Sequence, residues 1–218
     1  MGLAIFDLDE TLIATDSDLA WGEYLVSEGL VDADEHREKS AYFYEQYQRG
    51  ELDVREDLAY VCSVLARFSM PQLHELRAGF VRECIEPSIL PKGKALIAEH
   101  RGKGDFPLVI TSTIEFVVEP IVQLLGIDTL IATIPEIADD RYTGNILGIP
   151  SFGEGKVQRL NEWLAGGAHT LDGSYFYTDS HNDLPLLNLV EHPIAVDPDL
   201  KLQQAAEKNG WQIISLRD

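Results

Sequence analysis

Two carboxylates one residue apart, Asp7 and Asp9, stand near the start of the chain, after an apolar run that begins at Leu3. The run has a glycine before it and a polar turn after it, a pattern typical of a buried parallel strand. Side chains two residues apart on a strand point to the same side, so both carboxylates should share one face. Two acids placed in this way are costly unless a cation or a proton lies between them.

A second acidic group follows another predicted strand, at residues 174–178. Asp179 and Asp183 lie within the next turn, with Asn182 beside the latter. Such carboxylates suit a hard cation such as Mg²⁺, which takes oxygen ligands at about 2.0–2.1 Å and keeps several waters. Ligands of a doubly wound sheet collect beyond the carboxyl ends of its strands, so this group should meet the first one.

Thr111, Ser112 and Lys156 are the candidate anion-binding residues. Thr111 ends a predicted strand, and Ser112 is expected at the start of the following helix. Hydroxyls and free N–H groups at a helix start form an anion site, although such residues are also typical of simple N-caps. Lys156 begins a predicted helix, where it opposes the helix dipole; it is either an exposed surface lysine or a functional one.

The segment Phe6-Asp-Leu-Asp-Glu-Thr-Leu12 resembles the first motif, DxDx[TV], of the haloacid dehalogenase superfamily of aspartate-nucleophile phosphatases. The chain as a whole resembles the phosphoserine-phosphatase-like branch. Thr111, Lys156 and the Asp179–Asp183 pair follow in the order of the other three motifs. The resemblance covers residues 1–15 and 87–218, and its specificity comes from the combination.

The resemblance implies a role for each matching residue. Asp7 would attack phosphorus and Asp9 would act as general acid and base. Thr111 and Ser112 would bind the phosphate, and Lys156 would neutralise both the phosphate and the nucleophile.

A magnesium site is also implied, shared by Asp7, Asp9, Asp179 and Asp183. Asp179 would bind Mg²⁺ directly, Asp9 through its backbone carbonyl, and Asp183 from nearby or through water. Thr178 stands where the phosphoserine phosphatases have a glycine. His181, next to a site for a hard metal, is interpreted as a loop residue.

The elements needed to position these residues alternate in type. Strands are expected at 87–91, 106–111, 129–133, 174–178, 193–196 and 211–215, helices at 92–102, 115–125, 155–165, 183–189 and 199–208, and a hairpin with its turn at 140–144 within 137–149. Alternation of this kind predicts a doubly wound α/β fold with a mostly parallel sheet. Between the first strand and the rest, helices at 19–29, 33–49, 53–67 and 70–84 predict an all-helical cap, residues 16–86.

The cap should select the substrate. The resemblance implies that Asp16 holds an ammonium group and that Val61 stands where an arginine would bind a carboxylate. Asn182 is a further candidate for substrate contact. The cap is otherwise acidic and aromatic, and these residues either line the site or form the core of the cap: Asp16, Asp18, Trp21, Glu23, Tyr24, Tyr42, Phe43, Tyr44 and Tyr47.

Such a lining favours a cationic or ring-bearing amino alcohol phosphate, of which histidinol phosphate is an example. Phosphoserine remains an alternative, because Arg49 or Arg55 can also reach a carboxylate. A non-catalytic binding or regulatory protein on the same fold is a second alternative. A dehalogenase is disfavoured by Asp9, since those relatives lack the second acid of the motif.

Composition excludes several other classes of protein. Among 218 residues, 17 Lys and Arg stand against 37 Asp and Glu, a net charge of −20 that repels nucleic acid and anionic membranes. No apolar run reaches about 18 residues, and the N-terminus leads straight into a strand, so we expect a soluble cytoplasmic enzyme. Cys62 and Cys84 are interpreted as free thiols. A small phosphate ester is the expected partner, and the oligomeric state is not indicated.

Overall fold

A seven-stranded sheet organises the computed structural model, which describes residues 2–217. The strand order is β4-β3-β2-β1-β5-β6-β7, and every neighbouring pair is parallel except β3 and β4. The predicted doubly wound α/β class is therefore confirmed. The strands are β1 Leu3–Phe6, β2 Phe106–Ile114, β3 Leu130–Ala138, β4 Arg141–Leu147, β5 Tyr175–Thr178, β6 His192–Val196 and β7 Gln212–Ile214.

The order of strands reverses at β1, in the middle of the sheet. From β1 the chain adds β2, β3 and β4 on one side, and it then returns to add β5, β6 and β7 on the other. The carboxyl ends of β1 and β5 lie side by side, and the backbone N–H of Asp7 donates to the carbonyl of Tyr177 at 2.9 Å. In open α/β sheets, ligands bind at this type of switch point.

Helices cover both faces of the sheet, as alternation along the strands requires. Phe6 and Leu8 pack with α5 (Pro91–Lys103), α6 (Glu115–Leu124) and the helices that follow β1, whereas Leu3 and Ile5 pack on the opposite face. That second face is covered by α7 (Glu154–Leu164), α8 (Leu184–Leu187) and α9 (Leu200–Asn209). A core on each face holds β1 rigidly, and with it the residues that follow the strand.

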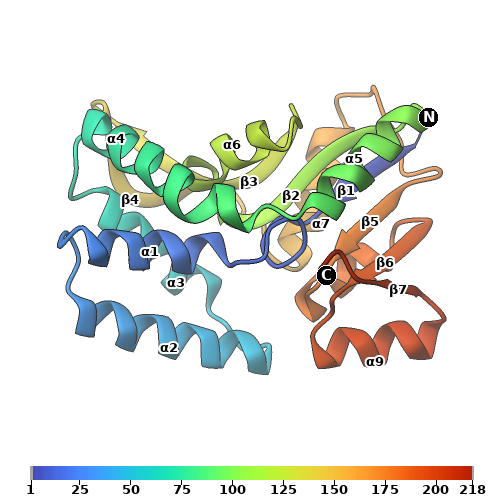
Figure 1. Ribbon diagram of the computed structural model, residues 1–218, viewed down its shortest axis with the longest axis horizontal. Helices are drawn as coiled ribbons and strands as arrows, with labels where there is room; N and C mark the ends of the chain where they lie inside the picture. Colours follow the sequence, from blue (N-terminus) through green and yellow to red (C-terminus); the bar gives the residue numbers. More distant parts are fainter. Residues whose placement is uncertain (1, 218) are drawn as a thin grey trace.

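Four helices form the unit that follows β1: α1 Ser17–Ser27, α2 Ala33–Arg49, α3 Val54–Leu65 and α4 Met70–Phe80 (Figure 1). Its core is aromatic: Trp21 packs edge-on against Phe80 and against Phe116 of α6. None of the helices formed by residues 2–217 is long and apolar enough to cross a membrane.

The aromatic residues of the helical unit differ in their exposure. Trp21, Tyr24 and Phe43 are buried within the helical unit, whereas Tyr42 and Tyr44 face solvent with 44% and 60% of their surface exposed. Burial of Trp21, Tyr24 and Phe43 fits the alternative that most of these aromatic residues form the core of the helical unit. A helix presents all its faces, and the sequence does not show which face meets the core domain.

Residues 87–91 form no strand of the sheet, contrary to expectation. The chain makes a π-helical turn at Val81–Ile85 and a 3₁₀ turn at Glu86–Ser88, and Ile89 then forms a single bridge with Ile13. Proline lacks the N–H that a central strand needs, and both ends of this segment are prolines.

The end of β2 and the turn of the β3–β4 hairpin also differ from expectation. β2 runs on to Ile114, so Ser112 lies in the strand and α6 begins only at Glu115. The β3–β4 hairpin is present, but its turn lies at Asp139 and Asp140, which both have positive φ, rather than at residues 140–144. Asp is one of the few residue types that tolerate this backbone region.

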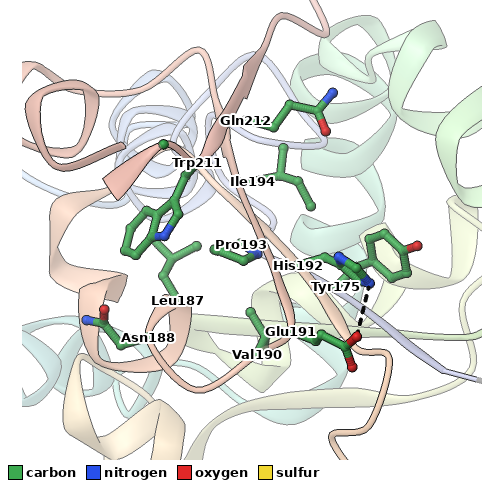
Figure 2. Close-up of a pocket in the computed structure, with 11 residues that line it drawn as sticks. Tyr175, Leu187, Asn188, Val190, Glu191, His192, Pro193, Ile194, Trp211 and Gln212 are labelled. Atoms are coloured by element: carbon green, nitrogen blue, oxygen red, sulfur yellow. Dashed lines mark ion pairs between the residues drawn. The ribbon is translucent and has the colours of Figure 1, made fainter. Parts of the chain in front are cut away.

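The larger of the two described pockets lies away from these strand ends. It has a volume of about 470 Å³ and is lined by residues that include Tyr175, His192 and Gln212 (Figure 2). These three residues begin β5, β6 and β7, so the pocket opens at the amino ends of the strands. It contains none of the predicted site residues, and size alone does not identify the functional site.

The end of α2 contacts the loop that follows β5. The hydroxyls of Tyr47 and Ser180 are 2.6 Å apart, and the Lys201 ammonium donates to the Gln48 carbonyl at 2.7 Å. The Tyr47 ring also lies against His181, with 6.4 Å between ring centroids. The helical unit is therefore fastened to the core beside Asp179.

We expect Tyr47→Phe to loosen this contact, because it removes a hydrogen bond worth about 1 kcal/mol from a partly buried site. Hydrogen–deuterium exchange of the amides in residues 44–50 should become several-fold faster. Tyr44→Phe, on the exposed side of the same helix, is the matched control. Equal exchange in the two variants would show that Tyr47 does not hold α2 to the core.

Candidate active site

Lys156 lies between two acids at the centre of the site. Its Nζ donates to Asp7 Oδ1 at 3.0 Å and to Asp183 Oδ2 at 2.7 Å. The three residues are at most 7% exposed. They come from the third position of α7, the end of β1 and the turn after β5, so three elements far apart in sequence meet here. The alternative of an exposed surface lysine is excluded.

Burial and charge act against each other in this group. Burial raises the pKa of Asp7 to about 6, helped by Asp183, while Lys156 acts in the opposite direction. Burial disfavours the ammonium of Lys156, but the neighbouring Asp183 and Asp7 nevertheless raise its pKa. At neutral pH Lys156 is charged and Asp7 is largely ionised, which is the form needed for a nucleophile.

Asp9 is held on both of its oxygens. Oδ1 accepts from the Ser17 backbone N–H at 2.8 Å, and Oδ2 accepts from the Thr113 hydroxyl at 2.8 Å. Burial raises the pKa of Asp9 to about 7, with Asp16 adding to the effect. A hydroxyl donates or accepts, so Asp9 can gain a proton and keep its contact with Thr113.

Threonines whose role the sequence reasoning missed complete the acidic group. The Thr11 hydroxyl donates to Asp179 Oδ1 at 3.1 Å, and the Thr178 hydroxyl donates to Asp183 Oδ2 at 2.7 Å. Thr113 does the same for Asp9, from a position two residues after Thr111. The period of two along a strand was a usable signal for Thr113, since it places both threonines on one side.

Thr111 and Ser112 lie at an irregularity in β2, not at a helix start. The pairing of β2 with β3 shifts register between Ile110 and Ile114, which is where these residues stand. Thr111 is buried, and its Oγ1 accepts from the Thr113 N–H at 3.3 Å. The prediction of backbone donors at the N-terminus of α6 is therefore wrong, because Thr111 and Ser112 lie inside β2. Phosphate binding by their hydroxyls stays a prediction.

The two candidate substrate contacts come from different elements. Asp16 is the exposed N-cap of α1, where its Oδ1 accepts from the N–H groups of Asp18 and Leu19 at 2.9 Å. Asn182 lies in the turn after β5, and its amide nitrogen is 3.4 Å from Ser180 Oγ. Their roles in binding remain predictions.

His181 is engaged on both ring nitrogens. Its Nδ1 is 2.6 Å from Asp199 Oδ2, and its Nε2 is 3.3 Å from the Lys201 ammonium. Because Nε2 faces an ammonium donor, Nδ1 carries the proton. These contacts fit the interpretation of His181 as a loop residue.

Comparisons with known proteins identify the family of this chain. A model of the haloacid dehalogenase-like hydrolase family matches residues 4–188. The chain belongs to this family. It is 48% identical to the "Histidinol-phosphatase" of Neisseria meningitidis serogroup C over 99% of both chains. The prediction of a hydrolase enzyme of the haloacid dehalogenase-like family is confirmed.

Solved structures show the same fold. A protein of unknown function from Bordetella pertussis Tohama I superposes with a TM-score of 0.92 at 42% identity, over 99% of this chain and 98% of that one. A phosphoserine phosphatase, solved as an analogue of its phospho-aspartyl intermediate, gives a TM-score of 0.72 at 18% identity, over 99% and 93%. At that identity the second likeness concerns the fold alone.

The predicted magnesium site of this hydrolase depends on how its acids are arranged. Among residues 2–217, no group of three or more His, Cys, Asp or Glu side chains has the arrangement of a metal site. The predicted set needs fewer, because Asp9 is expected to bind through its carbonyl and Asp183 through water. Burial raises the pKa of Asp179, and the neighbouring Asp7 and Asp183 raise it further. In the described part of the chain, these three acids stand against a single buried cation, Lys156. A hard cation with several waters therefore fits these residues.

We expect Lys156→Met to destabilise this hydrolase by about 3–5 kcal/mol at pH 7.5, because it leaves Asp7 and Asp183 facing each other in a buried site. The loss should be smaller at pH 5.5, because Asp7, whose pKa burial raises to about 6, takes up a proton there. Urea unfolding at both pH values measures it.

Lys103→Met is the matched control, because Lys103 pairs with Glu99 at 2.6 Å on an exposed helix surface. Such pairs contribute little. Equal stability losses for the two variants at pH 7.5 would contradict the role given to Lys156.

Proposed function

We propose that this chain is a magnesium-dependent phosphatase that cleaves a small amino-bearing phosphate ester through an aspartyl-phosphate intermediate, with histidinol phosphate as the favoured substrate. The relative named a histidinol-phosphatase supports the substrate, since it is 48% identical along the whole chain. The observation that carries the reaction type is the buried contact of Lys156 with Asp7, at the end of the central strand.

Asp7 is the proposed nucleophile. Its Oδ1 is held by Lys156 at 3.0 Å, which leaves Oδ2 for attack on phosphorus. As the new oxygen–phosphorus bond forms, the ester bond breaks and the leaving alkoxide takes a proton from Asp9. Lys156 stays charged throughout and offsets the charge on the phosphate oxygens.

Asp9 reverses its role in the second half of the reaction. It takes a proton from water, and the hydroxide attacks phosphorus. The bond between phosphorus and the Asp7 oxygen breaks, which restores the Asp7 carboxylate and releases phosphate. A pKa of about 7 suits this exchange, because both protonation states are populated at neutral pH. Ser17 and Thr113 fix the carboxyl group in place for both steps.

Asp7, Asp179 and the carbonyl of Asp9 are the proposed holders of Mg²⁺, with Asp183 contributing through water. When bound, the ion supplies positive charge that stabilises the phosphate oxygens. The hydroxyl of Thr11 orients Asp179 toward this role. Thr111 and Ser112 are the proposed phosphate contacts on the β2 side.

Substrate preference follows from the charge of the helical unit, residues 16–86, which we propose acts as a cap over the site. Val61 offers no guanidinium for a carboxylate, and one turn earlier on α3 stands an acid, Asp57. Asp16 is the proposed partner of the substrate's ammonium group, and Asn182 is a second contact. Arg49 is paired with Glu45 on the exposed side of α2, which disfavours it as a substitute for the arginine that would bind a carboxylate.

The nucleophile assignment predicts that Asp7→Asn abolishes phosphate release, because an amide cannot attack phosphorus or leave from it. Asp139→Asn, an exposed change in the β3–β4 turn, is the matched control and should retain full activity. Rapid quenching of the unsubstituted enzyme should place the phosphoryl label on Asp7. Turnover by the Asp7 variant, or a label on another residue, would remove the assignment.

The substrate assignment predicts a specificity constant, kcat/KM, about tenfold or more higher for histidinol phosphate than for phosphoserine. The physical reason is that phosphoserine adds a carboxylate beside acids, with no arginine to bind it. Steady-state phosphate release with both esters at pH 7.5 measures the difference. A preference for phosphoserine would contradict the argument that this chain lacks an arginine to bind the carboxylate.

A further inference from the structure

Two acids of the helical unit, Asp18 and Asp57, have no part in the mechanism above. Asp18 lies in the first turn of α1, next to Ser17, whose N–H donates to Asp9 at 2.8 Å. Asp57 lies in the first turn of α3. Neither forms an ion pair with any residue of the described range 2–217.

The helix faces that carry these acids point toward each other across a small cavity of about 30 Å³. On α1, Asp18 and Trp21 line it, one turn apart. On α3, Tyr60 lines it, and Asp57 stands three residues earlier on the same face. The cavity is large enough for a water-sized group.

The walls of this cavity carry polar atoms that lack partners. Asp18 Oδ1, Trp21 Nε1 and the Tyr60 hydroxyl are all shielded from solvent and make no hydrogen bond within residues 2–217. Trp21 is only 2% exposed. Buried polar groups are nearly always hydrogen-bonded, so three unpartnered ones in one place indicate a polar ligand, and the Asp18 carboxylate calls for a donor.

The charge at this place is uncompensated. Burial raises the pKa of Asp18, and Asp57 and Asp16 raise it further. Burial also raises the pKa of Asp57 to about 7, and the negative charge of Asp16 contributes to this increase. His36 lines the same cavity, but burial lowers its pKa and it supplies no charge at neutral pH. A cationic ligand would relieve this repulsion.

We propose that Asp18 and Asp57 are specificity-determining residues, which join Asp16 in binding the cationic nitrogen group of the substrate's alcohol part while the phosphate lies at Asp7. The inference deepens the proposed function and rests on it. A protonated amine is about the size of a water molecule, and it can donate hydrogen bonds to both carboxylates and to the hydroxyl of Tyr60.

The test compares two esters, histidinol phosphate and phenyl phosphate, in the variants Asp18→Asn and Asp57→Asn. Each change keeps the shape of the side chain and removes its charge. The ratio of kcat/KM for histidinol phosphate to kcat/KM for phenyl phosphate should fall by roughly tenfold or more in each variant, mainly through KM. An unchanged ratio in both variants would overturn the proposal.

Glu56→Gln is the matched control, because Glu56 is an exposed acid next to Asp57 on the same helix. Its ratio should equal that of the unsubstituted enzyme. Thermal unfolding controls for folding: relief of repulsion should leave Asp57→Asn at least as stable as the unsubstituted enzyme at pH 8. If Glu56→Gln lowers the ratio as much as the two other variants do, the effect is one of overall charge and the proposal fails.

A second measurement separates this proposal from the proposed function. Histidinol carries the cationic group without a phosphate, and its inhibition constant is measured with phenyl phosphate as substrate. It should inhibit the unsubstituted enzyme and bind about tenfold or more weakly to each variant. Failure to hydrolyse histidinol phosphate, with histidinol inhibition present, would refute the substrate alone. Inhibition that is absent, or unchanged in the variants, would refute the binding role of Asp18 and Asp57.

Discussion

The ammonium of Lys156, buried between Asp7 and Asp183, is the interaction on which the rest of the site depends. A charge removed from water is costly, and its partners compensate only when the geometry is good. The lysine reaches them from α7, on one face of the sheet, and lies 5.9 Å from the Phe176 ring centroid of β5. The ends of β1 and β5 and the start of α7 must therefore keep fixed positions.

Polar groups that satisfy the remaining oxygens extend this constraint outward. Thr178 binds the same oxygen of Asp183 that Lys156 binds, and Thr11 binds Asp179. The loop after β5 also carries Ser180, which meets Tyr47 of α2. A single short loop thus holds two acids of the site and the contact with the helical unit, so the position of that unit and the order of the site are linked.

The sequence was most informative where a local pattern has a local consequence. The helix predicted at residues 33–49 spans those residues in the structure, because its capping aspartate and its terminal glycine lie next to it in the chain. It was least informative at β2, where Thr111 was expected to end the strand. Pairing with β3 carries that strand on to Ile114, and such pairing is decided by a distant segment. The prolines around residues 87–91 argued against a strand, and this signal was missed.

The sequence by itself determined which chemical groups follow which strands, because alternation along a strand and a polar turn after it are local properties of the chain. It therefore indicated the acids, the lysine and the family. Only the tertiary structure decided which partners these groups meet. Lys156 and Asp7 are 149 residues apart, Thr113 and Asp9 are 104 apart, and Tyr47 and Ser180 are 133 apart. Contacts of this range depend on the strand order and on the face that each helix turns to its neighbours, and hydrophobic packing of the whole chain sets both.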